Sequence, residues 1–209
     1  MTLMSEIWFT SDLHMSHDKE FLWGPRGFKN QHEMNEAIVE RWNNVVEPDD
    51  IVYNLGDIAL SDVDDAIKYL KKLNGTQWWI RGNHDTQKKI ETICKACPRI
   101  SLISNPEASW ATMIIYEKKY HFLLTHYPTL TSNFDDKKLS RHVINLHGHT
   151  HQQKNFLQAE NPFMYHVGLD SHLCRPVHVE EVIADIKNRY NAQELLFEKY
   201  KEDRYGVPQ

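Results

Sequence analysis

Five short segments of this chain carry aspartate, asparagine and histidine side chains at close spacing. They are Asp12-Leu13-His14, Gly56-Asp57, Gly82-Asn83-His84-Asp85, His126 and Gly148-His149-Thr150-His151. Carboxylate, amide and imidazole groups without thiolates suit Mn²⁺, Fe or Zn²⁺ rather than copper. On an extended backbone, residues two positions apart face the same side. Asp12 and His14 can therefore share one ion, as can His149 and His151, and the pattern predicts a centre for two divalent metal ions.

Asp57 is the best candidate for a ligand shared by both ions, because the two oxygens of one carboxylate can each bind a cation. Asn83 offers a neutral oxygen, which adds a ligand without further negative charge in the site. Each segment alone also has a structural interpretation: Asp-x-His and Gly-Asp occur in ordinary loops, and a histidine-rich tract can be an incidental surface cluster. Their combination, in this order and mostly after apolar runs, favours the metal centre.

The elements that must position these residues are short strands. Runs rich in β-branched and aromatic residues cover 7–9, 51–55, 77–80, 121–124 and 143–146, and most of the five segments directly follow one of them. Apolar residues at helical spacing predict intervening helices, over about 34–45, 63–73 and 86–97. Because open α/β sheets place their sites at the carboxyl ends of the strands, we expect the five segments to lie close together in space.

The second half of the chain predicts antiparallel or mixed pairing. Strand-like runs around 102, 110–116 and 121–125 follow one another with short turns, and a last strand is expected over 163–168. A loop is expected over 127–140 and a C-terminal helix from Val179 to about residue 203. No internal repeat or interdomain linker is visible, so we expect one domain over 1–209 with its core at about 5–190.

Composition narrows the class of protein. The chain has 209 residues, is 41% hydrophobic and carries a net charge of −5, which argues against a broad basic surface for duplex nucleic acid. No apolar run approaches the roughly 18 residues of a membrane span. The N-terminal segment lacks the basic region of a leader, and three cysteines suit a reducing compartment, so we expect a cytoplasmic protein. Cys94 and Cys97 have the spacing of half a zinc site or a redox pair, but without a second such pair we favour structural cysteines.

The five segments resemble the signature of the calcineurin-like metallophosphoesterases, and the resemblance extends over about residues 7–170. It is closest to the small bacterial and phage members, also through Thr10-Ser11-Asp12-Leu13-His14-Met15-Ser16-His17 and His126-Tyr127-Pro128. The resemblance implies an α/β fold, a two-sheet β-sandwich flanked by helices in four α/β/β/α layers, with the site at one edge. It implies one metal on Asp12, His14 and His151, the other on Asn83, His126 and His149, and Asp57 as the bridge.

The resemblance also implies two catalytic residues. His84 corresponds to the family histidine that stabilises the transition state or protonates the leaving group. Asp85 would orient that imidazole and raise its pKa towards a useful acid. The two ions would clamp the phosphoryl group and acidify a bridging water, and the resulting hydroxide would attack phosphorus.

Four residues outside the five segments are candidates for substrate contact: His17, Arg26, Arg141 and His142. Arg141 stands shortly before the histidine-rich tract, and a guanidinium can grip a phosphate bidentately, although a solvated loop arginine is the alternative. In the insertion after the first strand, Trp23 and Phe28 offer stacking faces for a base, although a small local core would use the same residues.

These patterns predict a metal-dependent phosphoric ester hydrolase, most simply a phosphodiesterase on small or nucleotide-like esters. A phosphomonoesterase and a single-strand nuclease are alternatives, and the acidic net charge counts against the nuclease. A non-catalytic binding module on the same scaffold is a further alternative, which the complete set of proposed ligands disfavours. The sequence leaves the oligomeric state open.

Overall fold

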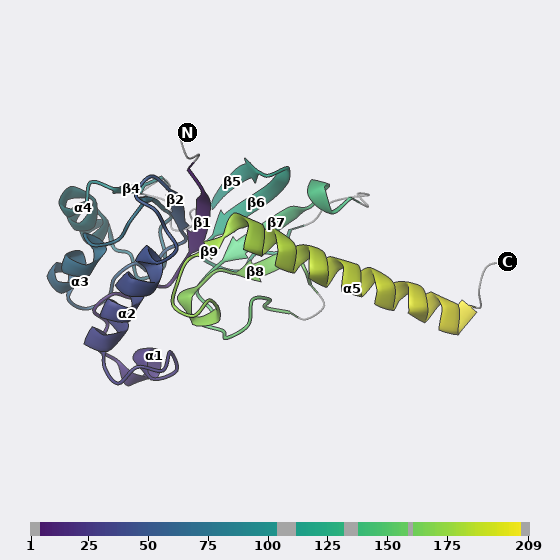
Figure 1. The fold of residues 1–209 in the computed structure, drawn as a ribbon, viewed down its shortest axis with the longest axis horizontal. Coiled ribbons are helices and arrows are strands. Elements are labelled where there is room, and N and C mark those ends of the chain that lie inside the picture. The colour runs from purple at the N-terminus through teal and green to yellow at the C-terminus, as the bar shows by residue number, and fades with distance from the viewer. Residues whose placement is uncertain (1–4, 104–111, 132–137, 159–160, 206–209) are drawn as a thin grey trace.

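A computed structural model of the chain describes residues 5–103, 112–131, 138–158 and 161–205. Their strands form two mixed sheets flanked by helices (Figure 1). The first sheet has the strand order β4 (Ile100–Leu102), β3 (Thr76–Trp79), β2 (Ile51–Asn54), β1 (Ile7–Thr10) and β9 (Val177–His178). The second has the order β5 (Thr112–Glu117), β6 (Tyr120–Thr125), β7 (Val143–His147) and β8 (Met164–His166). The two-sheet α/β sandwich that the sequence resemblance implied is therefore confirmed.

The first sheet is mainly parallel. It comprises β1 (Ile7–Thr10), β2 (Ile51–Asn54), β3 (Thr76–Trp79) and β4 (Ile100–Leu102), with β9 (Val177–His178) antiparallel to β1. The intervening helices are α2 (Gln31–Asn43), α3 (Val63–Leu70) and α4 (Gln87–Ala96). Each begins after a residue whose side chain accepts a backbone N–H in the first turn: Asn30, Asp62 and Thr86.

Both faces of the first sheet are buried, because alternate side chains of its strands enter different hydrophobic clusters. Trp8 packs with the residues of α2–α4, whereas its neighbour Phe9 packs into the space between the two sheets. Phe9 meets Phe122 of the second sheet with ring centroids 5.6 Å apart. This hydrophobic cluster holds the two sheets against each other, and it therefore also fixes the positions of the loops at the strand ends.

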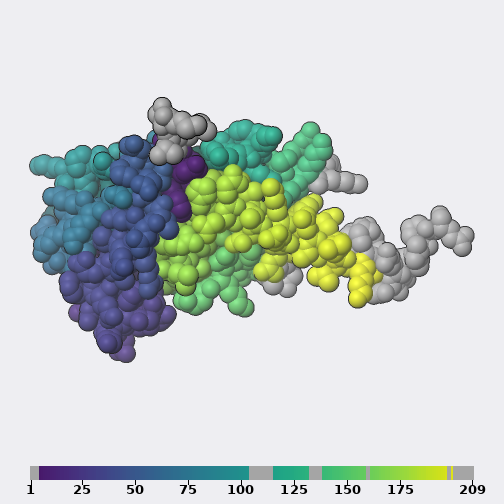
Figure 2. All heavy atoms as spheres, in the orientation of Figure 1, coloured from purple at the N-terminus to yellow at the C-terminus, as the bar shows by residue number. Residues whose placement is uncertain are grey.

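The second sheet comprises β5 (Thr112–Glu117), β6 (Tyr120–Thr125), β7 (Val143–His147) and β8 (Met164–His166). β5 is antiparallel to β6, while β6, β7 and β8 are parallel, so the mixed pairing expected from the sequence is confirmed. The long helix α5 (Val179–Tyr205) buries Val179, Val182, Ile183 and Ile186 at its start. Its second half extends away from the sheets (Figures 1 and 2).

Three details differ from the sequence-based expectation. The helix α1 (Glu20–Trp23) and the strand β9 were not predicted, because each has at most four residues. Helix α3 ends at Leu70 rather than at Asn74-Gly75, and Gly75, at φ 80°, lies instead in the turn that leads into β3. The expected strand start at Trp110 lies outside the described residues.

Within the described ranges, no helix combines the length and apolar character needed to cross a membrane.

Candidate metal centre

The five segments meet at the carboxyl edge of both sheets. Asp12 follows β1, Asp57 follows β2 and Asn83 follows β3 in the parallel part of the first sheet. His126 follows β6, and the tract containing His149 follows β7, in the parallel part of the second sheet. Parallel strands deliver their following residues to one edge, so the packing of the sheets brings all five segments together.

Backbone hydrogen bonds lock neighbouring segments to one another. The N–H of Asp12 donates to the carbonyl of Gly56 at 3.0 Å, and the N–H of His14 donates to the carbonyl of Asp57 at 2.9 Å. In the second sheet, the N–H of Gly148 donates to the carbonyl of His126 at 3.0 Å. The proposed ligands therefore stand on loops whose spacing is set by main-chain contacts.

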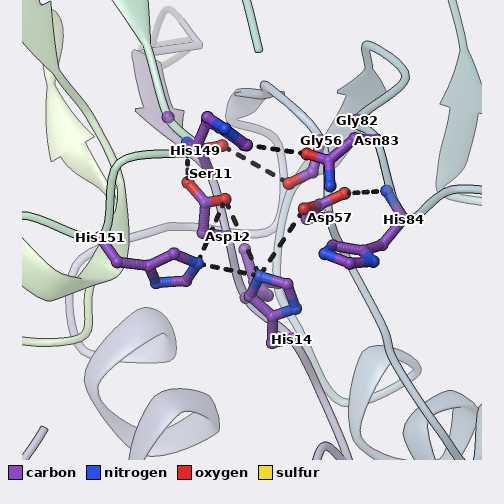
Figure 3. Close-up of polar contacts among 12 residues, drawn as sticks. Ser11, Asp12, His14, Gly56, Asp57, Gly82, Asn83, His84, His149 and His151 are labelled. Atoms are coloured by element: carbon purple, nitrogen blue, oxygen red, sulfur yellow. Dashed lines mark hydrogen bonds and ion pairs between the residues drawn. The ribbon is translucent and has the colours of Figure 1, made fainter. Parts of the chain in front are cut away.

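The first group of ligand atoms comes from Asp12, His14 and His151 (Figure 3). The Nε2 atoms of His14 and His151 lie 3.2 Å apart, and each lies 3.9 Å from Oδ1 of Asp12. That oxygen is buried and has no hydrogen-bond partner among the described residues. Ligand atoms around a tetrahedral ion lie about 3.3–3.6 Å apart, given bonds of about 2.0–2.2 Å. The three atoms therefore fit a divalent ion.

The second group comes from Asn83, His126 and His149. Oδ1 of Asn83 lies 2.7 Å from Nε2 of His126 and 3.0 Å from Nδ1 of His149. Oδ2 of Asp57 lies 3.4 Å from Nε2 of His126 and 3.7 Å from Nε2 of His14. One carboxylate thus faces atoms of both groups, as a bridging ligand would. Asp12, Asp57 and His126 also offer atoms within 4.8 Å of one another, so Asp12 is within reach of the second group as well.

The buried charges of the centre compensate one another. Burial raises the pKa of the Asp12 carboxyl and lowers that of His14 well below its usual value. Burial alone would raise the pKa of Asp57, but the hydrogen bond and charge of His126 hold it at about 2. Burial alone would lower the pKa of His126, yet contact with Asp57 and the charge of Asp12 raise it to about 9. A proton on His126 thus balances the carboxylates, and a cation that binds there would displace it.

Five of the proposed ligands have left-handed backbone conformations, which are unusual for residues other than glycine. Their φ values are 57° at Asp12, 48° at His14, 57° at Asp57, 66° at His149 and 48° at His151. Such residues cost about 1–3 kcal/mol each and gather at functional sites, where the surrounding structure holds them. The strain is thus a second indication, independent of side-chain type, that these loops are built for a function.

Glycines in the same segments allow the loops to pack closely. Gly56 has φ 107°, and a Cβ there would lie 2.6 Å from the backbone of Gly82. A Cβ at Gly82 would overlap the carboxylate of Asp57, and one at Gly148 would overlap the side chains of Ser11 and Asp12. The glycines of these motifs are required by the close approach of the ligand loops.

His84 lies at the centre, but the predicted role of Asp85 is wrong. The His84 ring lies 5.7 Å from the His14 ring between centroids, and its backbone N–H donates to Oδ1 of Asp57 at 2.8 Å. Asp85 is buried, and its Oδ2 accepts three N–H groups, from the Asp57 backbone, the Gly82 backbone and the Trp79 indole. Adjacent residues on this turn point in different directions, so Asp85 holds two ligand loops together rather than orienting His84.

Arg26 is not available to a substrate, contrary to the prediction. Its side chain has 0% exposure and makes a forked ion pair with Asp170. Its remaining N–H groups meet the backbone carbonyls of Asp12 and Leu13 and the sulfur of Met34. The guanidinium is therefore a positioning group underneath the first metal-binding loop.

Arg141 and His142 lie far from the centre, so their predicted contact with substrate is also wrong. Both precede β7, whereas the histidine-rich tract follows it, and a five-residue strand spans about 16 Å. The ring of His142 stacks on Phe163, with centroids 4.4 Å apart and planes at 9°. Although these residues are close to the histidine-rich tract in sequence, the length of β7 separates them from it in space.

A cavity of about 580 Å³ opens over the proposed ligands. It is lined by His14, His17, Phe21, Leu22, Pro25, Asp57, Leu60, His84, His149, His151 and Asp170. His17 therefore lies at this cavity, and its contact with substrate stays a prediction. Trp23 and Phe28 do not line the cavity; both pack into the helical core, and Phe21 stands where they were expected.

Two positioning residues were not among the sequence-based candidates. Asp170, in a short 3-10 turn after β8, accepts from Nδ1 of His151 at 3.0 Å. Lys89 is buried, and its Nζ donates to the carbonyls of Ala59 at 2.5 Å and His84 at 2.6 Å. An aspartate shortly after the last predicted strand, like those after β1 and β2, was a usable signal for Asp170. A lysine on a predicted helix gave no comparable signal.

Comparison with known proteins agrees with this geometry. Residues 6–166 match the calcineurin-like phosphoesterase superfamily domain. An uncharacterised protein of Methanocaldococcus jannaschii is 36% identical over 149 residues, which cover 68% of this chain and 85% of that protein. The Gene 66 protein of Mycobacterium phage D29 is 30% identical over 206 residues, covering 88% and 98%.

Among solved structures, a protein of unknown function from Aquifex aeolicus has the same fold. Its TM-score is 0.61 at 21% sequence identity, over 86% of this chain and 98% of that one. The family match covers most of the chain and contains in full every strand that a proposed ligand follows: β1, β2, β3, β6 and β7. The chain belongs to the calcineurin-like phosphoesterase superfamily.

Proposed function

We propose that this protein is a two-metal phosphodiesterase that acts on small or nucleotide-like esters. The observation that carries the proposal is the position of Asp57, whose Oδ2 faces Nε2 of His14 at 3.7 Å and Nε2 of His126 at 3.4 Å. A carboxylate between two groups of ligand atoms suits a bridged pair of ions. Oxygen and imidazole donors suit Mn²⁺, Fe or Zn²⁺.

Two divalent ions, when bound, stabilise charge on a phosphoryl group and lower the pKa of a bound water. The side chains around them supply binding and proton transfer. His84 lines the cavity, with its N–H on Asp57 and its carbonyl on Lys89, so both sides of its backbone are held. From this position its imidazole would donate a proton or hydrogen bond to an ester or phosphoryl oxygen.

A diester is favoured over a monoester by the charge of the cavity wall. Among the described residues that line it there is no lysine or arginine, and two of them are aspartates. A monoester dianion is usually gripped by such cations, especially by a forked guanidinium. A diester carries one negative charge and needs less compensation. The same wall disfavours a single-strand nuclease, which requires a basic groove along the backbone.

The test is hydrolysis of bis-p-nitrophenyl phosphate beside p-nitrophenyl phosphate by metal-stripped protein resupplied with Mn²⁺, Zn²⁺ or Mg²⁺. We expect faster cleavage of the diester, dependent on metal, with two ions bound per chain by elemental analysis. Faster cleavage of the monoester would indicate a phosphomonoesterase. Two bound ions without hydrolysis of either ester would support a binding module instead.

The proposal includes the cytoplasm as the compartment. All three cysteines, Cys94, Cys97 and Cys174, are thiols rather than disulfides in the structure, and sparse thiols suit a reducing environment.

A further inference from the structure

Residues of two chemical kinds line the cavity over the metal centre. One set comprises the proposed ligands and His84. The other set is apolar and comprises Phe21, Leu22, Pro25 and Leu60. We call these four residues the apolar wall. Hydrolysis at the ions requires only the polar residues, so the apolar wall needs a separate explanation.

Phe21 is the exposed aromatic member of the apolar wall. Its residue is 72% exposed, although it lies beside a deeply buried loop. The ring packs edge-to-face on His17, with centroids 5.6 Å apart and planes at 82°. In such a contact His17 meets either the edge or one face of the Phe21 ring, so at least one face of Phe21 is left open, as a stacking platform requires.

The segment that presents Phe21 is fixed to the metal centre. Leu22, the next residue, is 4% exposed and belongs to the helical core. A few residues on, the guanidinium of Arg26 donates to the backbone carbonyls of Asp12 and Leu13 at 2.7 and 3.1 Å. The exposed ring is therefore held at a set distance from the proposed ligands, rather than lying on an independent surface loop.

We propose that the apolar wall binds a planar ring on the substrate, aryl or nucleobase, with Phe21 as its stacking face. The inference rests on the proposed function and names its substrate class: one phosphoryl group at the ions and one flat ring a few bonds away. A cavity of about 580 Å³ lies within the range of small-molecule sites. A second phosphate on the substrate would meet no lysine or arginine among the described lining residues.

The experiment compares diesters that share one leaving group. Methyl, benzyl and thymidine-5′ esters of 2,2,2-trifluoroethyl phosphate share a leaving group without a ring and differ only in the substituent that remains on phosphorus; release of trifluoroethanol is followed by fluorine NMR. We expect KM for the benzyl and thymidine esters to be lower than for the methyl ester. Phe21→Ala should raise KM for the ring esters about tenfold, within the range for loss of one stacking ring, and leave the methyl ester unchanged. The ratio of the two ring esters distinguishes a general aryl site from a nucleobase site.

Three controls make the result specific. Phe21→Leu keeps an apolar side chain without a flat face, so it should behave like Phe21→Ala if stacking is the interaction. Tyr116→Ala removes another exposed aromatic ring, 62% exposed on β5, and should change nothing. Binding of phenyl phosphate to the metal-loaded protein, followed by equilibrium dialysis, should weaken in Phe21→Ala in parallel with KM.

Two outcomes would overturn the inference in different ways. Metal-dependent hydrolysis with equal KM for all three esters, unchanged in Phe21→Ala, would remove the ring site and leave the phosphodiesterase intact. Failure to hydrolyse any ester with any metal would overturn the proposed function and the inference with it.

Discussion

Arg26 and Asp170, 144 residues apart in sequence, form a forked ion pair directly behind His151. Nε of Arg26 lies 3.0 Å from Oδ1 of Asp170, and Nη2 lies 2.9 Å from Oδ2. The same Oδ2 accepts from Nδ1 of His151. Burial alone would raise the pKa of Asp170, but His151 and Arg26 hold it well below its usual value. The carboxylate therefore fixes the ring so that Nε2 of His151 faces His14.

Substitution of Asp170 should weaken metal binding, and it should also lower stability because Arg26 is then buried without its ionic partner. Partners of this kind orient metal-binding histidines, and their loss typically costs about 10- to 100-fold in metal affinity. We expect Asp170→Asn to show a loss of that size for one of two ions, measured by competitive chelator titration. Glu181→Gln, which breaks an exposed ion pair with Arg175, is the matched control. Two ions bound with unchanged affinity would show that Asp170 has no such role.

Asp57→Asn should lower activity far more than folding stability. The amide keeps one neutral oxygen for the N–H of His84. In place of the anionic Oδ2 between His14 and His126 it has an NH2 group, which cannot bind a cation. The loss in kcat/KM should exceed the roughly 10- to 100-fold loss that is typical when a residue that only orients a metal ligand is substituted. The free energy of unfolding, measured with urea, should change by at most about 2 kcal/mol. Wild-type turnover with both ions retained would exclude the bridging assignment, and Glu36→Gln on α2 is the surface control.

Asp85→Asn should distinguish two roles of Asp85: holding the ligand loops through hydrogen bonds, or acting through its negative charge on His84. An amide oxygen can still accept the N–H groups that Oδ2 receives, so activity should stay within about tenfold of wild type. Burial, and then the charge of Asp57, raise the pKa of Asp85 to about 6. A raised carboxyl pKa means that the folded chain binds the proton more tightly, so this group's contribution to stability falls as pH rises from about 4 to 6.

The pH dependence gives the measurement for Asp85. The unfolding free energy of metal-free protein is compared between pH 4 and pH 7 for wild type and Asp85→Asn, and the variant should lack the decline that Asp85 causes. A variant with wild-type pH dependence and an activity loss of several hundredfold would instead support direct action on His84.

Gly82→Ala should damage the centre through shape alone. A Cβ at position 82 would overlap the carboxylate of Asp57, which must then move away from His126. We expect fewer than two ions per chain and little hydrolysis, with far-ultraviolet circular dichroism unchanged. Gly75→Ala, at φ 80° in a turn distant from the centre, is the control for backbone strain: its melting temperature should fall while its metal content stays at two. Full metal content in Gly82→Ala would refute the steric argument.

Sequence patterns located the centre because strands and ligands are local features. Asp12 and Asp57 follow apolar runs of strand length, and parallel pairing carries both to one edge. The errors arose where sequence proximity was taken for spatial proximity. Asp85 neighbours His84 yet points into a different set of N–H groups, and Arg141 stands at the opposite end of β7 from the histidine tract.

Contacts between side chains that are far apart in the sequence could not be predicted from the sequence. Nothing in the residues around Arg26 indicates that Asp170 would pair with it in a buried position, since that contact depends on how the insertion after β1 folds against the turn after β8. The choice of Phe21 over Trp23 as the exposed ring depends on which face of a four-residue helix meets the core. Packing decides both points.

The left-handed ligand residues bear on how this protein would respond to laboratory evolution. Glycine at Asp12, Asp57 or His149 would relieve a backbone strain of about 1–3 kcal/mol and would remove a proposed ligand in the same step. Selection for heat resistance alone would therefore favour variants that melt later and hold no metal. A thermostable, active form has to be sought by screening turnover and melting temperature together, with changes placed away from these loops.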